Sequence, residues 1–302
     1  MSTQYVAGIL AAIVLAAFWL FLHIGERIQR ARNRRMAEEW RTANPAGPPL
    51  TREERDAFGA WVETATLPAI ILVPSTAEPE ARGTRIGGPA WLAEGEAWPL
   101  DREGRAMEFI AQLDFGALPA IPDFPQAGLL QFFIAQGDFF GADFDHPDQG
   151  DIRLIWRPEP APGRLVPPQP LDPETSMTPL AAAARDKGLT LAGSLGAMPP
   201  TPADWQVDAR LGYREGVDAI VDALDDRGRA FLGVHHVGGH PAYTQFDYRS
   251  ADRFADYDRT LLRLTSDNAL MWGDMGEAAF TIRREDLIAR RFDRAIFYWD
   301  CT

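Results

Sequence analysis

The sequence predicts an α+β protein of internally duplicated antiparallel β units with a few flanking helices, preceded by one N-terminal transmembrane helix. Three observations lead to this class. The N-terminus is a long uncharged apolar run, four short blocks recur in the same order about 150 residues later, and these blocks are β-type runs separated by turns. The content of 46% hydrophobic and 24% charged residues is typical of a folded protein.

Residues 1–24 are predicted to be the transmembrane anchor. No residue between Val6 and Leu22 is charged, and roughly 20 helical residues span the hydrocarbon core of a bilayer. A cleavable signal peptide is disfavoured, because Met1–Gln4 carries no positive charge and no small-residue cleavage site follows. The arginines crowded over 27–35 predict a single-pass protein with its N-terminus outside and its globular domain in the cytoplasm.

The charge balance limits the predicted partners. Residues 1–41 carry six Arg and three Glu, a local charge of +3, so the remainder of a chain with net charge −13 carries −13 − 3 = −16. Such an acidic body argues against nucleic acid as a partner. The predicted partners are the lipid bilayer, through the N-terminal helix, and a protein or peptide. The single cysteine, Cys301, cannot form an internal disulfide and favours a reducing compartment.

Residues 25–50 are predicted to be a basic juxtamembrane segment and a Pro/Gly-rich linker, and residues 51–302 the folded domain. Thr51 and Glu54 have the spacing of a capping box and predict a short amphipathic helix. The apolar run over 67–75, bounded by prolines, predicts a buried strand.

Two repeat units, about 84–157 and 235–300, are predicted from four pairs of blocks. The pairs are RIGGPAW with HVGGHPAY, FIAQL with LLRLT, GLLQFFI with GEAAFTI, and IRLIW with AIFYW. Paired glycines fit a bend with positive φ or close backbone approach, and this bend is the part that recurs. Two units of one topology are expected to pack their sheets around a common core.

The segment 158–200 joins the two units. Eight prolines fall in 158–179, which predicts a long surface connection rather than a helix or a central strand. The apolar stripe of Val217, Ile220, Val221 and Leu224 predicts a helix in the second half of 201–228.

Five blocks carry a resemblance to a known family: TRIGGPAWLAEGEAWP (84–99), FIAQLDFGALP (109–119), GLLQFFIA (128–135), HHVGGHPAYTQ (235–245) and LTSDNALMWGDMGEAAFTIRREDL (264–287). They resemble the YwqG-like family, a bacterial family of unknown function, over roughly residues 65–302. The resemblance implies an α+β fold with duplicated antiparallel sheets, and it supplies no reaction, cofactor or catalytic residue. Thr265 stands where the family pattern usually has Asp, and Arg263 where it usually has Gln.

The histidines His235, His236 and His240 fall within six positions. If they enter a bend from a strand, His236 and His240 could share a side and bind a metal through imidazole. A structural zinc needs two more ligands, and no cysteine is near. We therefore expect histidines that are partly buried or stabilise the bend, and we predict neither a metal nor a cofactor.

A binding loop is predicted around SDNALMWGDMG (266–276), with Asp267, Asp274 and an exposed Trp272 before a strand. Gln245, after the second Gly-Gly bend, completes the set of candidate binding residues. An aromatic residue flanked by carboxylates suits a cationic or amide-rich partner. The alternative is a turn whose Asp and Gly residues fix its geometry.

Two further motifs are set aside. The acidic loop 137–151 has five aspartates that suit calcium, but Pro147 and Asp148 break the EF-hand spacing, so a solvated hairpin loop is expected. AGSLG (192–196) lacks the first glycine of a nucleophile elbow and no helix can follow it.

The favoured hypothesis is a membrane-tethered cytoplasmic module that binds a partner without catalysis. The alternative is a metal-assisted hydrolase that uses the histidines at 235–240.

Overall fold

A computed structural model of the chain describes residues 42–43, 45–159, 162–173, 177–231 and 233–302. The chain divides into two compact units. Among the described residues, one comprises 42–43 and 45–49 together with Tyr213–Glu215, and in it the backbone N–H of Gly47 donates to the carbonyl of Tyr213 over 3.0 Å. The other comprises Leu50–Gly212 and Gly216–Thr302 and holds the strands described below.

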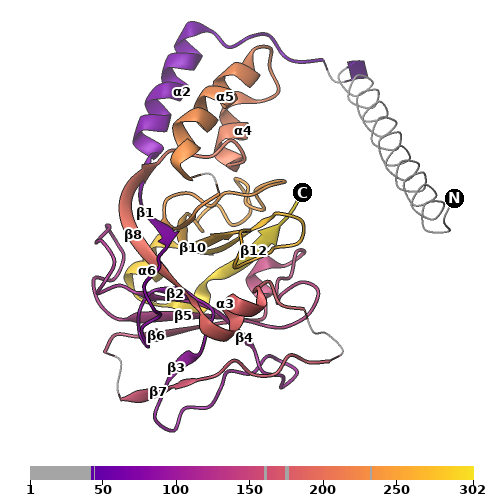
Figure 1. Cartoon of the computed structure of the whole chain (residues 1–302). Helices are drawn as coiled ribbons and strands as arrows, with labels where there is room; N and C mark the ends of the chain where they lie inside the picture. Colours follow the sequence, from indigo (N-terminus) through magenta and orange to yellow (C-terminus); the bar gives the residue numbers. More distant parts are fainter. Residues whose placement is uncertain (1–41, 44, 160–161, 174–176, 232) are drawn as a thin grey trace, which may run out of the picture. The chain divides into compact units, whose positions relative to one another are not determined.

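Ten strands form one antiparallel sheet in the order β12-β11-β10-β9-β1-β8-β2-β4-β5-β6 (Figure 1). Their bounds are β1 (Leu67–Pro74), β2 (Arg85–Ile86), β4 (Glu108–Asp114), β5 (Leu129–Ile134), β6 (Ile152–Arg157), β8 (Leu189–Met198), β9 (His235–Gly238), β10 (Arg259–Thr265), β11 (Glu277–Ile282) and β12 (Ile296–Asp300). A separate two-stranded sheet pairs β3 (Ala90–Ala93) with β7 (Gly163–Val166).

The strand order is symmetric about the central pair of β1 and β8. Outward from β8 lies a first arm of β2, β4, β5 and β6, and outward from β1 lies a second arm of β9, β10, β11 and β12. The recurring blocks occupy matching strands, since 85–91 begins at β2 and 236–243 begins at β9. Register matches as well, because Arg85 pairs with Gln112 in the first arm and His236 with Arg263 in the second.

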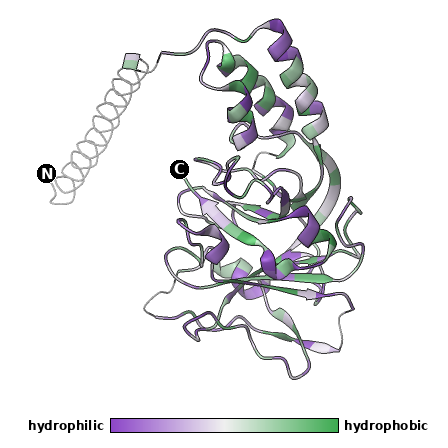
Figure 2. Ribbon diagram, turned by 180° about the vertical axis from the view of Figure 1, so that it is seen from behind, coloured by the Kyte–Doolittle hydropathy of each residue, from purple (hydrophilic) through white to green (hydrophobic). Residues whose placement is uncertain are grey.

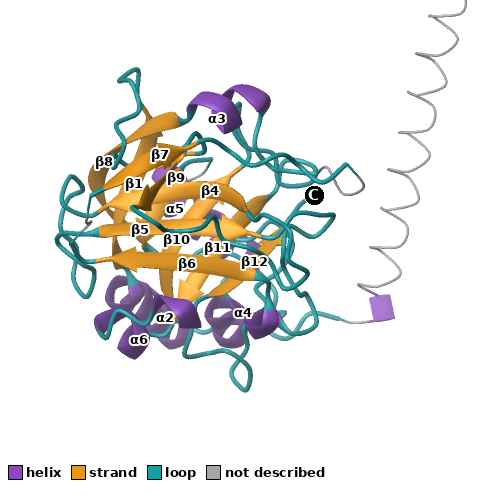
Figure 3. Cartoon of the chain, turned by 90° about the horizontal axis from the view of Figure 1, so that it is seen from below, coloured by secondary structure: helices purple, strands orange, loops and turns teal. Residues whose placement is uncertain are grey.

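The two arms face each other across one hydrophobic core (Figure 3). Phe132 of β5 and Phe280 of β11 come from opposite arms, and their ring centroids lie 4.9 Å apart. Trp156 of β6 contacts Phe292, which precedes β12, at 5.1 Å. Figure 2 shows the apolar residues of these strands. Burial of large side chains from both arms is the main force that holds them together.

Each arm begins with the same Gly-Gly bend. Gly87 and Gly88 have φ values of 60° and 75°, and Gly238 and Gly239 have 72° and 67°. In both copies, the side chain of the residue two positions before the first glycine bonds to the carbonyl of that glycine. Arg85 Nε donates to the Gly87 carbonyl over 3.3 Å, and His236 Nδ1 pairs with the Gly238 carbonyl over 2.9 Å.

Helices α2 (Arg52–Ala65), α4 (Trp205–Leu211) and α5 (Val217–Gly228) pack together at one end of the sheet (Figure 1). The predicted capping box is confirmed, since Thr51 and Glu54 bond reciprocally at the start of α2. The predicted strand at 67–75 and the helix after 217 are also confirmed. The shorter helices are α3 (Ala182–Lys187) and α6 (Arg284–Ile288), with 3-10 turns at Pro147–Gln149, Arg229–Phe231 and Phe292–Arg294.

The predicted α+β class of duplicated β units is wrong, because both arms belong to one continuous ten-stranded sheet and the described residues form few helices. The reason is β8, which lies inside the segment 158–200 that was predicted to be a surface connection. Its pairing with β1 joins the two arms, so the arms are not separate sheets. No helix among the described residues is long and apolar enough to cross a membrane, and the transmembrane helix predicted over 1–24 falls outside those residues.

Substitution of a bend glycine by alanine should destabilise the sheet. A Cβ atom would lie 2.4 Å from the Ala184 carbonyl oxygen at Gly87, and 2.7 Å from the Pro68 carbonyl oxygen at Gly238. With the added cost of positive φ, we expect Gly87→Ala and Gly238→Ala each to lower the free energy of unfolding by about 2–4 kcal/mol in urea denaturation of the full-length protein. Gly95→Ala is the control, since Gly95 has positive φ and open space around it. Equal midpoints for all three variants would contradict the prediction.

Candidate functional site

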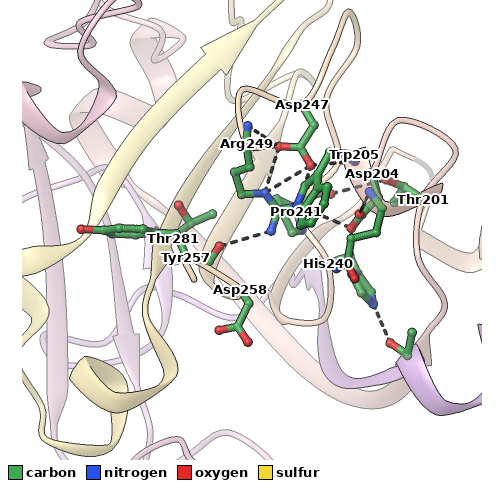
Figure 4. Close-up of polar contacts among 12 residues, drawn as sticks. Thr201, Asp204, Trp205, His240, Pro241, Asp247, Arg249, Tyr257, Asp258 and Thr281 are labelled. Atoms are coloured by element: carbon green, nitrogen blue, oxygen red, sulfur yellow. Dashed lines mark hydrogen bonds and ion pairs between the residues drawn. The ribbon is translucent and has the colours of Figure 1, made fainter. Parts of the chain in front are cut away.

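Four charged or polar side chains form a buried charged cluster where the helices meet the loop that follows the second Gly-Gly bend (Figure 4). They are Asp204, His240, Asp247 and Arg249, whose side chains are exposed by 0%, 8%, 2% and 2%. Buried charges persist in proteins only when they are paired and hydrogen-bonded. The members of this cluster satisfy one another.

Asp204 is placed by helix α4, because it is the N-cap residue of that helix. Its Oδ1 accepts from the backbone N–H of Gln206 over 2.8 Å, while Oδ2 lies 3.2 Å from His240 Nδ1 and 3.4 Å from Arg249 Nη2. Burial alone would raise the pKa of Asp204, but the hydrogen bond with His240 and the charge of Arg249 outweigh it and lower the pKa below its usual value.

His240 connects the cluster to helix α2. Its Nδ1 faces Asp204, and its Nε2 lies 2.7 Å from the carbonyl oxygen of Ala65, the last residue of α2 (Figure 4). Both ring nitrogens thus face oxygen atoms of other residues. His240 is the residue inserted in the second Gly-Gly block, so the insertion supplies the link between the sheet and the helices.

Arg249 and Asp247 form the most tightly bonded pair of the cluster. Arg249 Nη2 donates to Asp247 Oδ2 over 2.6 Å and Nε to Oδ1 over 2.9 Å, a bidentate geometry. Arg249 Nη1 also reaches the carbonyl of Tyr257 over 3.2 Å. Burial would lower the pKa of Arg249, yet the hydrogen bonds and charge of Asp247 prevail and raise it. This pair fixes the loop that forms one wall of the neighbouring cleft.

An open cleft of about 660 Å³ borders the cluster, with α4 and residues 202–203 on one side and loop 245–252 on the other. Its lining consists of Pro202, Ala203, Trp205, Asp208, Ala209, Gln245, Phe246, Asp247, Arg249, Ser250, Ala251 and Asp252. We call it the acidic cleft, because three aspartates line it and its one arginine is paired with Asp247. Phe246 stands at its edge and is 56% exposed.

A second exposed feature, the aromatic patch, shares Phe246 with the cleft. It consists of Phe139, Phe144 and Phe246, exposed by 61%, 38% and 56%. The rings of Phe144 and Phe246 both contact Tyr298 of β12, with centroids 5.4 and 6.3 Å away, and Phe139 contacts Phe144 at 5.5 Å. The patch therefore brings together loop 137–146 and the loop after the second bend.

The predicted binding residues are not all brought together, although Gln245 and Asp274 each bond to one of the last two residues of the chain. Gln245 lines the acidic cleft, and its backbone N–H donates to Asp300 over 2.6 Å. Asp274 lies on an exposed turn, and its carbonyl accepts from the Thr302 hydroxyl. Asp267 lines a different cavity of about 400 Å³ beside α3.

Trp272 is not exposed as predicted but fully buried, at 0% exposure. The Ser266 hydroxyl accepts from the backbone N–H of Trp272 over 2.9 Å, and the Trp272 carbonyl accepts from Gly276, so the turn folds back on itself. This geometry directs the indole into the core, where it contacts Phe140 at 5.6 Å. Core packing rather than ligand contact explains this residue.

The three neighbouring histidines point to separate partners. His235 accepts the backbone N–H of Thr265 at Nδ1, which leaves the proton on Nε2, 3.3 Å from Asp267 Oδ2. His236 bonds the Gly238 carbonyl, and His240 bonds Asp204 and Ala65. Among the described residues, no group of three or more His, Cys, Asp or Glu side chains has the arrangement of a metal site.

Most residues of the cleft and cluster carry no clear mark in the sequence. Asp204 is separated from His240 by 36 positions, and Phe246 looks like any other loop aromatic. Two local signals do exist. Asp204 before the apolar residues of α4 has the character of an N-cap, and His240 interrupts an otherwise regular repeat.

The fold and the cleft define an antiparallel β-sheet protein with a small helical layer and an open acidic cleft. Residues 84–301 match the model of a family described as Domain of unknown function (DUF1963), and the chain belongs to that family. No curated protein matches the chain.

Removal of the Asp204 charge should destabilise the protein more at neutral pH than at acidic pH. The lowered pKa means that the folded state favours the carboxylate, so its contribution is present above about pH 4 and is lost as pH falls through the folded pKa. We expect Asp204→Asn to lower the free energy of unfolding by about 1–3 kcal/mol at pH 7, with a smaller difference from wild type at pH 3 in urea denaturation. Asp208→Asn, at an exposed position of the same helix, should change little. A pH-independent difference for Asp204→Asn would refute the assignment.

Proposed function

We propose that the chain is a non-catalytic binding module that holds a basic protein segment with apolar anchor residues, in the acidic cleft and across the aromatic patch. The observation that carries this proposal is Phe246. It is a large aromatic side chain, 56% exposed, that belongs to both features. Clustered exposed aromatic residues are enriched at protein interfaces and often supply most of the binding energy.

The charge of the surface supports a basic partner. Asp208 and Asp252 line the cleft in addition to the neutralised Asp247–Arg249 pair, and loop 137–146 adds Asp138, Asp143 and Asp145 beside the aromatic patch. The chain as a whole has a formal net charge of −13. Such a field accelerates the encounter with a basic segment and discourages acidic competitors. Arginine can also stack on an exposed phenylalanine ring.

The bonding within the cleft favours binding over catalysis. Asp247 and Arg249 are buried and hydrogen-bond each other, so both side chains are already engaged within the protein. The alternative of a metal-assisted hydrolase has less support, because the ring nitrogens of His235 and His240 are engaged with partners within the protein. We also propose that the chain is YwqG-like, because of the five sequence blocks that resemble that family.

Loss of the Phe246 ring should weaken binding of a basic aromatic peptide. The probe is a fluorescent, capped hexapeptide of alternating arginine and phenylalanine, measured by anisotropy with the full-length protein. We expect Phe246→Ala to raise the Kd at least about tenfold, because a central aromatic anchor is lost. High salt should also weaken binding. An otherwise identical peptide with glutamate in place of arginine should not bind.

Leu195→Ala is the matched control, since Leu195 is 63% exposed on β8 and lies in neither the cleft lining nor the patch. It should leave the Kd unchanged. Equal effects of Leu195→Ala and Phe246→Ala on the Kd would show that the cleft is not a specific site. Equal affinities of the unaltered protein for the arginine and glutamate peptides would show the same.

We also propose that the protein is held at a membrane with the globular domain in the cytoplasm. Only the sequence of residues 1–41, with its apolar run and following arginines, supports this location. A C-terminal fusion to green fluorescent protein should fluoresce in the membrane fraction of bacterial cells, and a C-terminal alkaline phosphatase fusion should be inactive. An active phosphatase fusion would show that the globular domain lies outside the cytoplasm and would contradict this proposal.

A further inference from the structure

A smaller cavity of about 250 Å³ adjoins the acidic cleft, and Pro202 and Ala203 line both. We call it the Glu277 cavity. Arg263 of β10 and Glu277 of β11 contribute its charged surface, together with Asp225 of α5. Apolar and aromatic side chains form much of the remainder, among them Met198, Phe231 and Tyr243. One cation and two carboxylates give this lining a net negative charge.

The ion pair in this cavity leaves one carboxylate oxygen without a partner. Arg263 is 2% exposed and donates to Glu277 Oε2 from both Nε and Nη2, while its Nη1 donates to the carbonyls of Phe231 and Val234 over 3.1 and 3.0 Å. No hydrogen bond from a described residue reaches Glu277 Oε1. The Glu277 side chain is 18% exposed. An ionised carboxylate offers acceptor sites on both oxygens, so Oε1 can receive a further donor.

The carboxylate of this ion pair has no counterpart in the first arm, where Leu129 begins β5 as Glu277 begins β11. Gln112 occupies the place in the first arm that Arg263 occupies in the second, and Gln112 Nε2 donates to the carbonyls of Ala81 and Gly83 over 3.2 and 2.9 Å. Arg85 Nη1 donates to the same two carbonyls, so a buried guanidinium supports this segment in both arms, but no ion pair with a described carboxylate accompanies Arg85. Burying a charged pair has a larger desolvation cost than burying an amide. Because a guanidinium without a paired carboxylate supports the first bend, the carboxylate of Glu277 calls for a role beyond supporting the second bend.

One residue that lines the cavity has a buried polar atom without a partner. The hydroxyl of Tyr243 is buried and forms no hydrogen bond with any described residue. Tyr243 and Phe231 both contribute to the lining, so two aromatic rings accompany the carboxylate. Carboxylates and aromatic faces together are the groups that proteins use to bind organic cations.

We propose that the Glu277 cavity binds an organic cation, a guanidinium or primary ammonium group on a short apolar stem, with the cation against Glu277 and the stem against the apolar walls. The cation can belong to a free small molecule or to an arginine or lysine side chain of a segment held in the adjoining acidic cleft. Only the second source rests on the proposed function. Burial raises the pKa of Glu277 against the opposing charge of Arg263, and a bound cation would favour the ionised carboxylate.

Titration of the full-length protein with butylguanidinium, followed by calorimetry, tests the proposal, and butylurea is its neutral isostere. We expect butylguanidinium to bind with an affinity at least about tenfold higher than that of butylurea, because only the former carries the charge. Glu277→Gln should remove this preference, while Tyr243→Phe, which keeps the ring, should retain it. Equal affinities for the two probes, or an unchanged preference in Glu277→Gln, would overturn the proposal.

Glu96→Gln is the matched control for a broken ion pair, since Glu96 pairs with Arg157 over 2.7 Å in the other arm. It should leave the butylguanidinium affinity unchanged, and a reduction equal to that of Glu277→Gln would contradict the proposal. If Glu277→Gln unfolds, Phe231→Leu takes its place and should lower the affinity severalfold by removing one ring. Competition between butylguanidinium and the arginine peptide would show that an arginine side chain of a bound segment can supply the cation. Butylguanidinium binding that survives Phe246→Ala, with peptide binding lost, separates this site from the acidic cleft.

Discussion

The antiparallel pairing of β1 with β8 is the interaction on which the rest of the structure depends. These two long strands, paired over eight positions, stand between arms that begin with the very short strands β2 and β9. Without the central pair, the inner edges of both arms would present unpaired backbone groups. The central strands satisfy those groups, since β9 pairs with β1 and β2 pairs with β8, and they position the arms so that Phe132 and Phe280 meet in a shared core.

The Gly-Gly bends then decide where the chain leaves the sheet. A Cβ at Gly87 or Gly238 would collide with a backbone oxygen, so the tight passage requires glycine at both places. After the first bend the chain continues into β3, whereas after the second bend it enters the loop that contains His240. That one inserted residue reaches the end of α2 and the N-cap of α4. The helical layer and the cleft beside it therefore depend on a local difference between two otherwise similar bends.

The buried polar residues also differ between the two arms. In the first arm Gln112 and Gln131 form neutral amide hydrogen bonds beside the buried guanidinium of Arg85. In the second arm Arg263 at the matching place requires the carboxylate of Glu277. The acidic cleft and the Glu277 cavity both lie on the second arm and its helices, while the first arm retains an amide at this place. A shared backbone frame thus permits one copy to specialise while the other maintains the core.

The sequence by itself determined the local elements, because their causes are local. Thr51 and Glu54 mark the start of α2, the apolar stripe after Val217 marks α5, and the recurring blocks mark strands in matching positions. Tertiary structure alone decided that β8 joins the arms into one sheet, that Trp272 is buried, and that Asp204 meets His240 and Arg249. These outcomes depend on hydrogen bonds and burial between residues far apart in the chain, and no periodicity or spacing within a short segment records which distant surfaces will meet.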